Sequence, residues 1–242
     1  MQSNTIFWQA VVNWPPLKAG SIRGRFFLQN AGLCANIIWD SGYYTDNVVT
    51  HFANSWRLFM RNFSIDKDNT ALLIVDMQER LIPVMPDGGR VISNCLNLIE
   101  LAKLYAIPIM LTEQYPKGLG ITVPEIRNAL AAYQPFEKTN FSCCGNSDFT
   151  TALQQLGRIN ILLTGMEAHV CVLQTCLDLI SGGFNTHLVR DAVCSRSAAN
   201  FDTGIEMMRD AGAVITCTET ALFQLLKAAG TDEFRAIAKR IK

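Results

Sequence analysis

The sequence lacks an excess of charge of either sign. Its 242 residues include 21 Lys and Arg and 21 Asp and Glu, which gives a formal net charge of +0 at pH 7. Domains that bind nucleic acid usually gather Lys and Arg in a patch or stripe, and this sequence contains no such cluster. We therefore expect a small-molecule substrate and no nucleic-acid partner.

Long hydrophobic runs are also missing. No apolar run approaches the roughly 18 uncharged residues that would indicate a membrane-spanning helix, so we expect no membrane partner. The hydrophobic content is nevertheless 49%, which is enough to bury a large core in a chain of this length. The composition favours one globular domain with an additional segment.

Histidine is scarce, and Gly-rich phosphate loops are absent. The three histidines show none of the paired spacing of a metal site, and the chain has no motif for a dinucleotide or a nucleoside triphosphate. Eight cysteines are present, but they are scattered along a chain whose apolar content needs no disulfides, so we interpret them as free thiols. We expect neither a metal ion nor an organic cofactor.

A regular pattern of apolar segments begins only at about Asn69. We therefore predict an N-terminal extension over residues 1–64 and a domain over residues 65–242. The extension has five basic residues and two acidic ones, which are Lys18, Arg23, Arg25, Arg57, Arg61, Asp40 and Asp46. This composition is compatible with a mitochondrial transit segment, while a loosely packed extension and a gene-model artefact are the alternatives. The expected location is the cytoplasm, or the mitochondrion if the segment is a transit peptide.

From that point on, apolar runs of strand length alternate with segments of helical period. Strands are predicted at 70–77, 107–113, 135–141, 160–166, 186–190 and 213–217, and helices near 89–105, 122–132, 146–156, 169–182, 200–211 and 219–228. Strand runs without polar alternation are buried on both faces, and their alternation with helices is typical of parallel sheets. The prediction is an α/β fold, a doubly wound, mostly parallel six-stranded sheet with helices on both faces.

One cysteine lies where a predicted strand turns into a helix. The strand at 160–166 breaks at Gly165, and Cys171 follows at the start of the next helix. The unpaired N–H groups and the positive end of the helix dipole stabilise a thiolate there, so we expect the pKa of Cys171 to be lowered toward the working pH. The alternative for any single cysteine is a buried packing role.

Two charged residues lie in or at the ends of other strands. Asp76 lies at the end of the strand at 70–77, and Lys138 lies in the short strand at 135–141. If the strands before Asp76 and Cys171 are neighbours where the strand order reverses, their side chains meet in one crevice. Each alone has a simpler interpretation, a helix cap for Asp76 and a solvated charge for Lys138. Together with Cys171 they outline a hydrolase active site.

Three separated motifs occur in one order along the domain. They are Leu73-Ile-Val-Asp76-Met-Gln78, Phe136-Glu-Lys138-Thr139 and Gly165-Met-Glu-Ala-His-Val-Cys171-Val-Leu-Gln-Thr175. On these motifs the chain resembles the isochorismatase-like cysteine hydrolase family over about residues 65 to 242. The run from Thr112 to Gly120, followed by Val123-Pro-Glu, is similar to the subgroup of animal isochorismatase domain-containing proteins and bacterial YcaC-like hydrolases.

The resemblance implies a mechanism and an assembly. Asp76 would take the thiol proton and later deliver it to the leaving group, Lys138 would stabilise the thiolate and the carboxylate, and Cys171 would attack a carbonyl to give a thioester. It also implies a cis peptide bond between Met166 and Glu167, with the backbone N–H groups of Glu167 and Cys171 directed at the oxyanion. A homo-oligomer is expected on the same basis.

Departures from other members of the resembled family bear on the substrate. Nicotinamidases hold a metal with an Asp and paired histidines. In this chain, no histidine lies in the segment directly after the first or the second predicted strand of the domain. Isochorismatase proper lacks the nucleophilic cysteine, which is present here. A small amide or ureide is therefore the expected substrate class. Candidate pocket residues are Gln78, Gln114, Tyr115 and His169, and for His169 a capping or solvent-facing position is an equal alternative.

Two other functions stay open at this point. The chain could be a catalytically idle family member that acts as an interaction protein, in which case Cys171 would react no faster with a small electrophile than the other cysteines. It could also be a thiol redox sensor, in which case Cys171 would be oxidised reversibly without any hydrolytic turnover. The intact Asp76, Lys138 and Cys171 set argues for the enzyme.

Overall fold

The computed structural model describes residues 22–27, 34–39 and 62–241. The chain divides into two units, Met1–Arg57 and Leu58–Lys242. In the first unit β1 (Ile22–Phe27) pairs antiparallel with β2 (Cys34–Trp39), two strands that the sequence analysis did not assign. The suggested transit segment otherwise lies outside the described residues, and the boundary between residues 64 and 65 stays a prediction.

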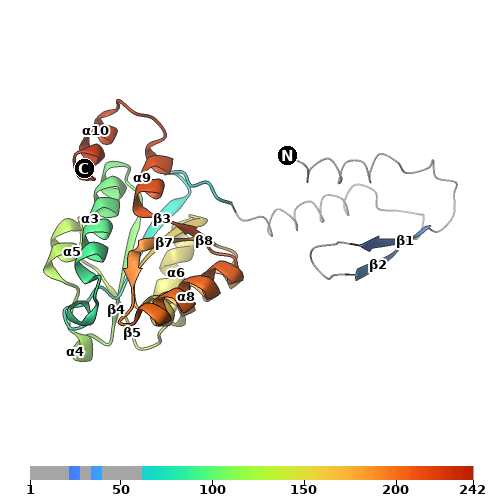
Figure 1. Ribbon diagram of the computed structural model, residues 1–242, viewed down its shortest axis with the longest axis horizontal. Coiled ribbons are helices and arrows are strands. Elements are labelled where there is room, and N and C mark those ends of the chain that lie inside the picture. Colours follow the sequence, from blue (N-terminus) through green and yellow to red (C-terminus); the bar gives the residue numbers. More distant parts are fainter. Residues whose placement is uncertain (1–21, 28–33, 40–61, 242) are drawn as a thin grey trace. The chain divides into compact units, whose positions relative to one another are not determined.

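The second unit is built on a parallel sheet (Figure 1). Its strand order is β5-β4-β3-β6-β7-β8, which confirms the predicted six-stranded α/β sheet. The strands are β3 (Thr70–Val75), β4 (Ile109–Gln114), β5 (Phe136–Lys138), β6 (Asn160–Met166), β7 (Asn185–Cys194) and β8 (Val214–Thr216). The chain runs outward from β3 to β5, then returns to β6 on the other side of β3. The strand order thus reverses between β3 and β6, which is where such sheets place their binding crevice.

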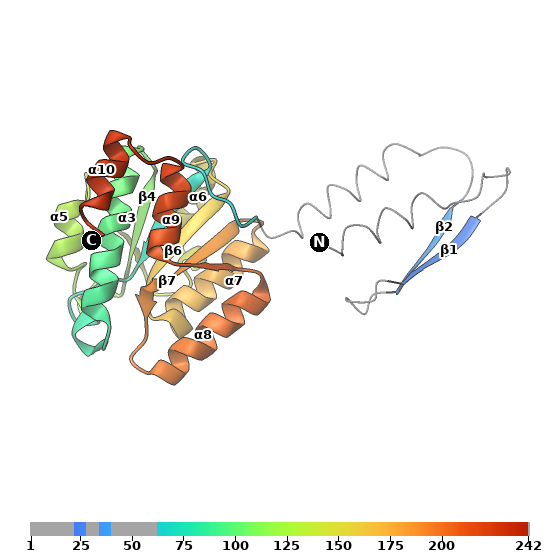
Figure 2. The same cartoon turned by 45° about the horizontal axis from the view of Figure 1, so that its top comes forward.

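Helices cover both faces of this sheet because its central strands are apolar on both sides (Figure 2). In β3, Leu72 and Ile74 join one core cluster, and Ala71 and Leu73 join the other. The first cluster packs against α3 (Gly88–Leu104), α5 (Pro124–Ala129), α9 (Thr218–Leu226) and α10 (Asp232–Ala238). The second packs against α6 (Ser147–Gln155), α7 (Leu173–Ser181) and α8 (Ala198–Ala211).

Several elements differ from the sequence-based prediction. β7 extends to Cys194, beyond the predicted end at residue 190, and its pairing with β6 contains a register shift between Leu163 and Gly165. The helix predicted at 122–132 is the shorter α5, and α10 was not predicted. Short helical segments connect these elements: η1 (Ile82–Val84), α4 (Pro116–Leu119), η2 (Cys143–Gly145) and η3 (Ala168–Val172).

The described part of the chain also bears on two other expectations. None of its helices has both the length and the apolar content needed to cross a membrane. Seven of the eight cysteines are described with their side chains, and all seven are free thiols. The interpretation of the cysteines as thiols is therefore confirmed for these seven.

Candidate active site

Asp76 follows directly after β3 and is completely buried. Its backbone is left-handed, with a φ of 51°, a conformation that Asp adopts more readily than most residues. The Thr112 hydroxyl donates to its Oδ1 at 2.7 Å, and the Lys138 ammonium donates to its Oδ2 at 2.7 Å. Both carboxylate oxygens are therefore held by fixed donors.

Lys138 ends β5, and its side chain is 1% exposed. Besides Asp76, its Nζ donates to Gln114 Oε1 at 2.7 Å and to the Phe141 carbonyl at 3.0 Å. Burial alone would lower the pKa of Lys138, but the charge interactions with Asp76, Cys143 and Cys171 and the hydrogen bond to Asp76 together outweigh it, so the pKa is raised. Lys138 is thus a fixed positive charge inside the site.

Cys171 lies in the π-helical turn η3, which connects β6 to α7, and is 6% exposed. The Glu167 carbonyl accepts from the N–H groups on either side of it, those of Val170 at 3.0 Å and Val172 at 3.2 Å. Burial raises the pKa of Cys171, and the charge of Asp76 and a hydrogen bond to it raise the pKa further, while Lys138 partly offsets them. The resting group is a neutral thiol that donates to Asp76.

The expected lowering of the Cys171 pKa is therefore wrong. The expectation rested on a thiol in the first turn of an α-helix and gave no weight to its burial or to the charge of Asp76. In the structure α7 starts only at Leu173, and Cys171 is buried next to the ionised Asp76. A thiolate there would lose its hydration and face a like charge. These two effects destabilise it more than the nearby helix N-terminus stabilises it.

The three predicted catalytic residues come together across the strand reversal. β3 pairs with β6, so Asp76 and Cys171 leave neighbouring strands, and β5 brings Lys138 from the edge of the sheet. Lys138 and Asp76 form a direct ion pair, and both influence the ionisation of Cys171. This arrangement can hold a neutral thiol beside an ionised base.

The turn before Cys171 carries one other feature that the resemblance implied. The peptide bond between Met166 and Glu167 is cis. The Glu167 side chain contacts Arg196, whose backbone N–H and Nε donate to Oε2 at 3.0 and 3.1 Å. Its carboxylate therefore ties the turn to the segment after β7, and any catalytic role of Glu167 would belong to its backbone N–H.

Gln78 and Gln114 both brace the site. The Gln78 amide accepts from Gln114 N at 2.8 Å and donates to Gln114 O at 3.0 Å and to Gly120 O at 2.6 Å. Gln114 in turn donates to the Thr139 carbonyl at 2.8 Å while it accepts from Lys138. The two glutamines hold the loop after β4 and the side chain of Lys138 in place.

Tyr115 and His169 lie further out. Tyr115 is 55% exposed and lines a pocket of about 390 Å³ together with Lys117, Lys138 and Asn140. His169 Nδ1 lies 3.0 Å from Ser195 Oγ, and its Nε2 lies 3.4 Å from Asn200 Nδ2. His169 thus contacts both the segment that follows β7 and the helix α8. A pocket role for Tyr115 or His169 stays a prediction.

Two residues of this site were not found from the sequence. Thr112 at the end of β4 is fully buried and contacts Asp76, and the Cys143 thiol lies 3.7 Å from the Thr112 hydroxyl. Burial raises the pKa of Cys143 to about 12, with the charge of Asp76 as the next cause. The sequence signal for Thr112 is its position two residues before Gln114 in the same strand, whereas nothing in the sequence distinguishes Cys143 from a packing cysteine.

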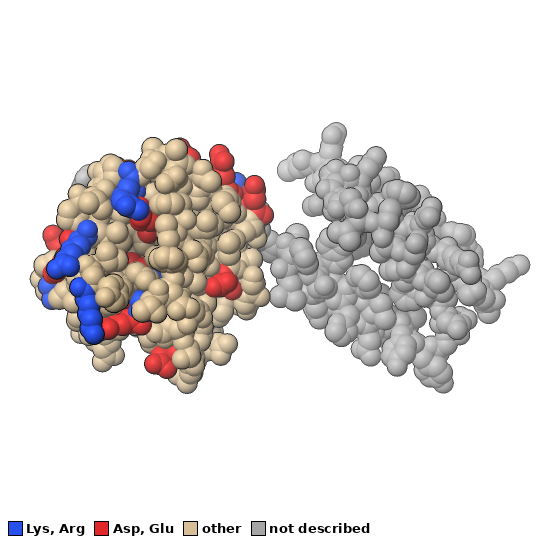
Figure 3. Space-filling model, turned by 90° about the horizontal axis from the view of Figure 1, so that it is seen from below, with Lys and Arg blue, Asp and Glu red and all other residues tan. Residues whose placement is uncertain are grey.

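Figure 3 shows the molecule from below, from the end at which Figure 1 shows α4, the short helix that follows the carboxyl end of β4. Lys and Arg side chains gather on one side of this face, and Asp and Glu side chains lie among and beside them. Within the described ranges, no group of three or more His, Cys, Asp or Glu is placed to hold a metal ion.

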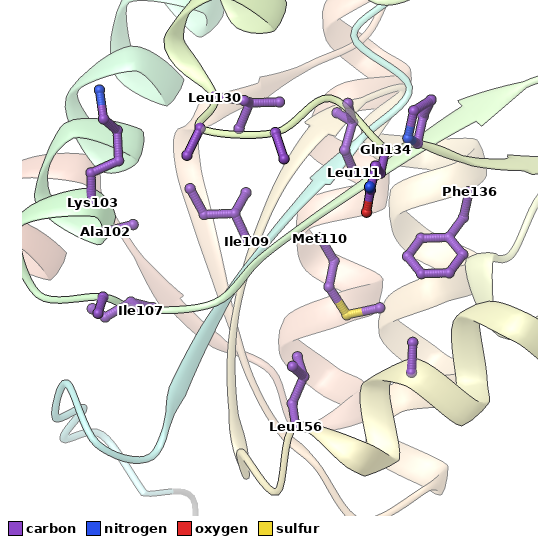
Figure 4. A pocket seen from close by; sticks show the side chains of 15 residues that line it. Ala102, Lys103, Ile107, Ile109, Met110, Leu111, Leu130, Gln134, Phe136 and Leu156 are labelled. Atoms are coloured by element: carbon purple, nitrogen blue, oxygen red, sulfur yellow. The ribbon is translucent and has the colours of Figure 1, made fainter.

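A second, apolar cavity lies away from the candidate site. Its volume is about 850 Å³, and its lining includes Ile107 and Ile109 before and in β4, Leu130, Phe136 and Leu156 (Figure 4). None of the predicted site residues contributes to this lining. The cavity is therefore no part of the arrangement around Cys171.

Comparison with known families places this geometry in context. Residues 70–220, more than half of the chain, match the isochorismatase domain. The chain belongs to the isochorismatase family. This confirms the resemblance drawn from the three motifs.

Relatives and solved structures agree with this assignment. The chain is 39% identical over 180 residues to the secreted isochorismatase effector Isc1 of Phytophthora sojae, a match that covers 72% of this chain and 85% of that protein. It is 37% identical over 171 residues to isochorismatase domain-containing protein 2 of Danio rerio, which covers 70% and 85% of the two chains.

Among solved structures, the MAR1 ribonuclease of Caenorhabditis elegans is 38% identical with a TM-score of 0.69, over 74% of this chain and 92% of that one. YcaC from Pseudomonas aeruginosa, solved with hexane-2,5-diol and covalent acrylamide, is 26% identical with a TM-score of 0.68. The match covers 73% of this chain and 91% of that one. Both share the α/β fold described above.

Proposed function

We propose that this protein is a cysteine hydrolase that cleaves a C–N bond of a small amide or ureide through a thioester at Cys171. The observation that carries the proposal is the buried ion pair of Lys138 and Asp76, with Nζ and Oδ2 2.7 Å apart, beside a protonated thiol. This is the arrangement that an acyl transfer needs, because it keeps a base ionised next to a nucleophile that must lose its proton.

In the first half of the reaction, Cys171 Sγ attacks the carbonyl carbon while Asp76 takes the thiol proton. The oxyanion that forms accepts hydrogen bonds from the backbone N–H groups of Glu167 and Cys171. Asp76 then gives the proton to the leaving nitrogen, the C–N bond breaks, and a thioester and a free amine result. Lys138 keeps Asp76 ionised before each step in which Asp76 accepts a proton.

Water completes the cycle. Asp76, ionised again, takes a proton from a water molecule as its oxygen attacks the thioester carbon. The C–S bond breaks, Cys171 regains the proton, and a carboxylic acid or carbamic acid leaves. Every proton in this sequence stays between substrate, water and the two side chains, so the proposed steps call for no cofactor.

The comparison with YcaC supports a reactive nucleophile in this fold. The Pseudomonas aeruginosa protein is 26% identical and was solved with covalent acrylamide, which is an amide and an electrophile. We infer that Cys171 is the corresponding reactive group here. We also propose that the protein forms a homo-oligomer and that it is located in the cytoplasm. Size-exclusion chromatography with light scattering tests the oligomeric state.

The name of the Caenorhabditis elegans neighbour introduces a second candidate, cleavage of RNA. The basic side chains on one side of the face in Figure 3 are the surface that RNA phosphates would contact. The buried triad favours a small amide or ureide as the substrate, because the phosphodiester of an RNA chain would have to reach a thiol that is 6% exposed. An RNA substrate therefore belongs in the same assay as the amides.

The test compares the full chain with two variants of buried free cysteines, Cys171→Ala and Cys176→Ala. Amides, ureides, nicotinamide and RNA are supplied as substrates. Amine release and RNA cleavage are measured, and mass spectrometry of the quenched protein detects an acyl adduct. We expect amide or ureide turnover and an acyl adduct in the parent and in Cys176→Ala, and a loss of several orders of magnitude in Cys171→Ala. Turnover that survives in Cys171→Ala, or RNA cleavage alone, would sink the proposal.

The same experiment separates the other two functions. An idle family member would show no turnover, and Cys171 would react with iodoacetamide no faster than Cys176. A redox sensor would show reversible oxidation of Cys171 by hydrogen peroxide and no adduct with any substrate.

A further inference from the structure

Thr112 holds Asp76 by two groups at once. The register of the sheet pairs Val75 with Thr112, so the end of β4 lies beside the residue that follows β3. The Asp76 N–H donates to the Thr112 carbonyl at 3.2 Å, and the Thr112 hydroxyl donates to Asp76 Oδ1 at 2.7 Å. Both residues have no exposed surface, so no water competes for these contacts.

We propose that Thr112 is a positioning residue of the active site, whose hydroxyl fixes the direction of the Asp76 carboxylate while the Cys143 thiol fixes the direction of that hydroxyl. This inference rests on the proposed function and extends it to two residues outside the triad.

The direction of each hydrogen bond follows from the groups present. An ionised carboxylate can only accept, and a hydroxyl has one proton, so the proton of Thr112 is committed to Asp76. The oxygen lone pairs of Thr112 remain, and the Cys143 thiol donates to one of them at 3.7 Å. The high pKa of Cys143, about 12 because of its burial, is consistent with a thiol that keeps its proton for this purpose.

Cys143 is itself held from the other side of the site. Its N–H donates to the Thr175 hydroxyl at 2.9 Å, and Thr175 lies in α7, four residues after the nucleophile. The chain of contacts Thr175, Cys143, Thr112 and Asp76 therefore links the helix that follows Cys171 to the base that serves it. A displacement of the base relative to the nucleophile would break one of these contacts.

The two donors on Asp76 have different effects. Lys138 supplies charge at Oδ2, whereas Thr112 supplies a directed bond at Oδ1. Without the hydroxyl, the buried Oδ1 would lose the donor that Thr112 supplies, the ionised carboxylate would be less stable, and the carboxyl group would be less restricted in turning about its last bond. Proton transfer from Cys171 would then start from a poorly aligned pair.

The experiment measures acylation of Cys171 in the full chain by p-nitrophenyl acetate, a generic activated ester. The burst of p-nitrophenolate gives the rate between pH 5 and 9, and mass spectrometry locates the acetyl group. Thr112→Val is compared with Thr112→Ser, which keeps the hydroxyl. Thr186→Val is the matched control, because Thr186 is a buried β-strand threonine whose hydroxyl has no partner among the described residues.

We expect Thr112→Val to acylate roughly 10- to 100-fold more slowly, the range for loss of a hydrogen bond to a charged group. The acidic limb of its pH–rate profile should move to higher pH, because the ionised base is less stable. Thr112→Ser should restore both the rate and the limb, Cys143→Ala should give a smaller loss, and Thr186→Val should behave like the parent. Thermal unfolding of each variant checks that the fold is kept.

Two results would overturn the inference while leaving the proposed function intact. One is a Thr112→Val protein that acylates as fast as the parent at every pH. The other is a Thr112→Ser protein as slow as Thr112→Val, which would show that shape and not the hydroxyl matters. A parent protein that forms no acetyl adduct at Cys171 would overturn the proposed function and, with it, this role of Thr112.

Discussion

Lys138 and Asp76 form an ion pair of 2.7 Å in which the two side chains are 1% and 0% exposed. Neither charge has water to replace its partner. Such a pair costs desolvation energy when it forms, but removal of one member leaves a buried charge without compensation, which is far more costly. The pair therefore governs the stability of this region, and its two charges act in opposite directions on the pKa of the buried Cys171.

Replacement of Lys138 by Met should lower the free energy of unfolding by about 3 to 5 kcal/mol, because Asp76 would stay buried without its cation. Lys103→Met is the matched control. Lys103 is a partly exposed lysine 3.8 Å from Glu100, and such surface pairs contribute about 0 to 1 kcal/mol. Urea denaturation measures both, and equal midpoints for the two variants would contradict this account of the pair.

Asp76→Asn should separate hydrolysis from alkylation. Hydrolysis should fall by several orders of magnitude because the amide accepts no proton. Alkylation of Cys171 by iodoacetamide should instead shift to lower pH, since the Asp76 charge raises the pKa of Cys171 and Lys138 lowers it. The alkylation rate against pH measures this, with the exposed Asp202→Asn as control. An unchanged or higher alkylation midpoint would show that Asp76 does not control the thiol.

Buried His187 predicts a loss of stability in mild acid. Burial lowers the pKa of His187 from 6.5 to about 4, with a backbone hydrogen bond to Asn62 as a smaller, opposing cause. The folded state thus favours neutral His187, so its contribution is fully present above about pH 6.5 and is lost as the pH falls toward 4, up to about 3 kcal/mol. The difference in unfolding free energy between pH 7.5 and pH 4.5 should shrink in His187→Leu. If the parent and the variant lose the same amount, the dependence comes from other groups.

Gly165→Ala should disrupt the reversal point of the sheet. Gly165 has a φ of +108°, and an added Cβ would lie 2.0 Å from the Val75 carbonyl oxygen, the strand partner just before Asp76. Backbone would have to move, so we expect a loss of more than about 4 kcal/mol or failure to fold. Gly89→Ala is the control, because its Cβ would meet nothing within 4 Å in α3 and should add up to about 1 kcal/mol. Chemical denaturation that finds Gly165→Ala as stable as the parent would rule out this close approach.

The sequence by itself determined the layers of the domain and the edge at which its chemistry lies. The strands β3 and β6 are mostly apolar and are buried at every position, because both faces of a central parallel strand are covered by helices. Asp76, Lys138 and Cys171 could be assigned to one site because each lies in or after a strand, and the carboxyl ends of parallel strands share one edge of the sheet.

Only the tertiary structure decided the protonation state of Cys171 and the contacts that hold Asp76. The pKa of Cys171 depends on burial and on a carboxylate that lies far away in the sequence, so the local signal of a helix start predicted the wrong direction. Thr112 and Asp76 are 36 residues apart, and their contact exists only because of the register between β3 and β4. Local patterns report which face a residue occupies, whereas ionisation and hydrogen-bond direction depend on neighbours that only packing brings within reach.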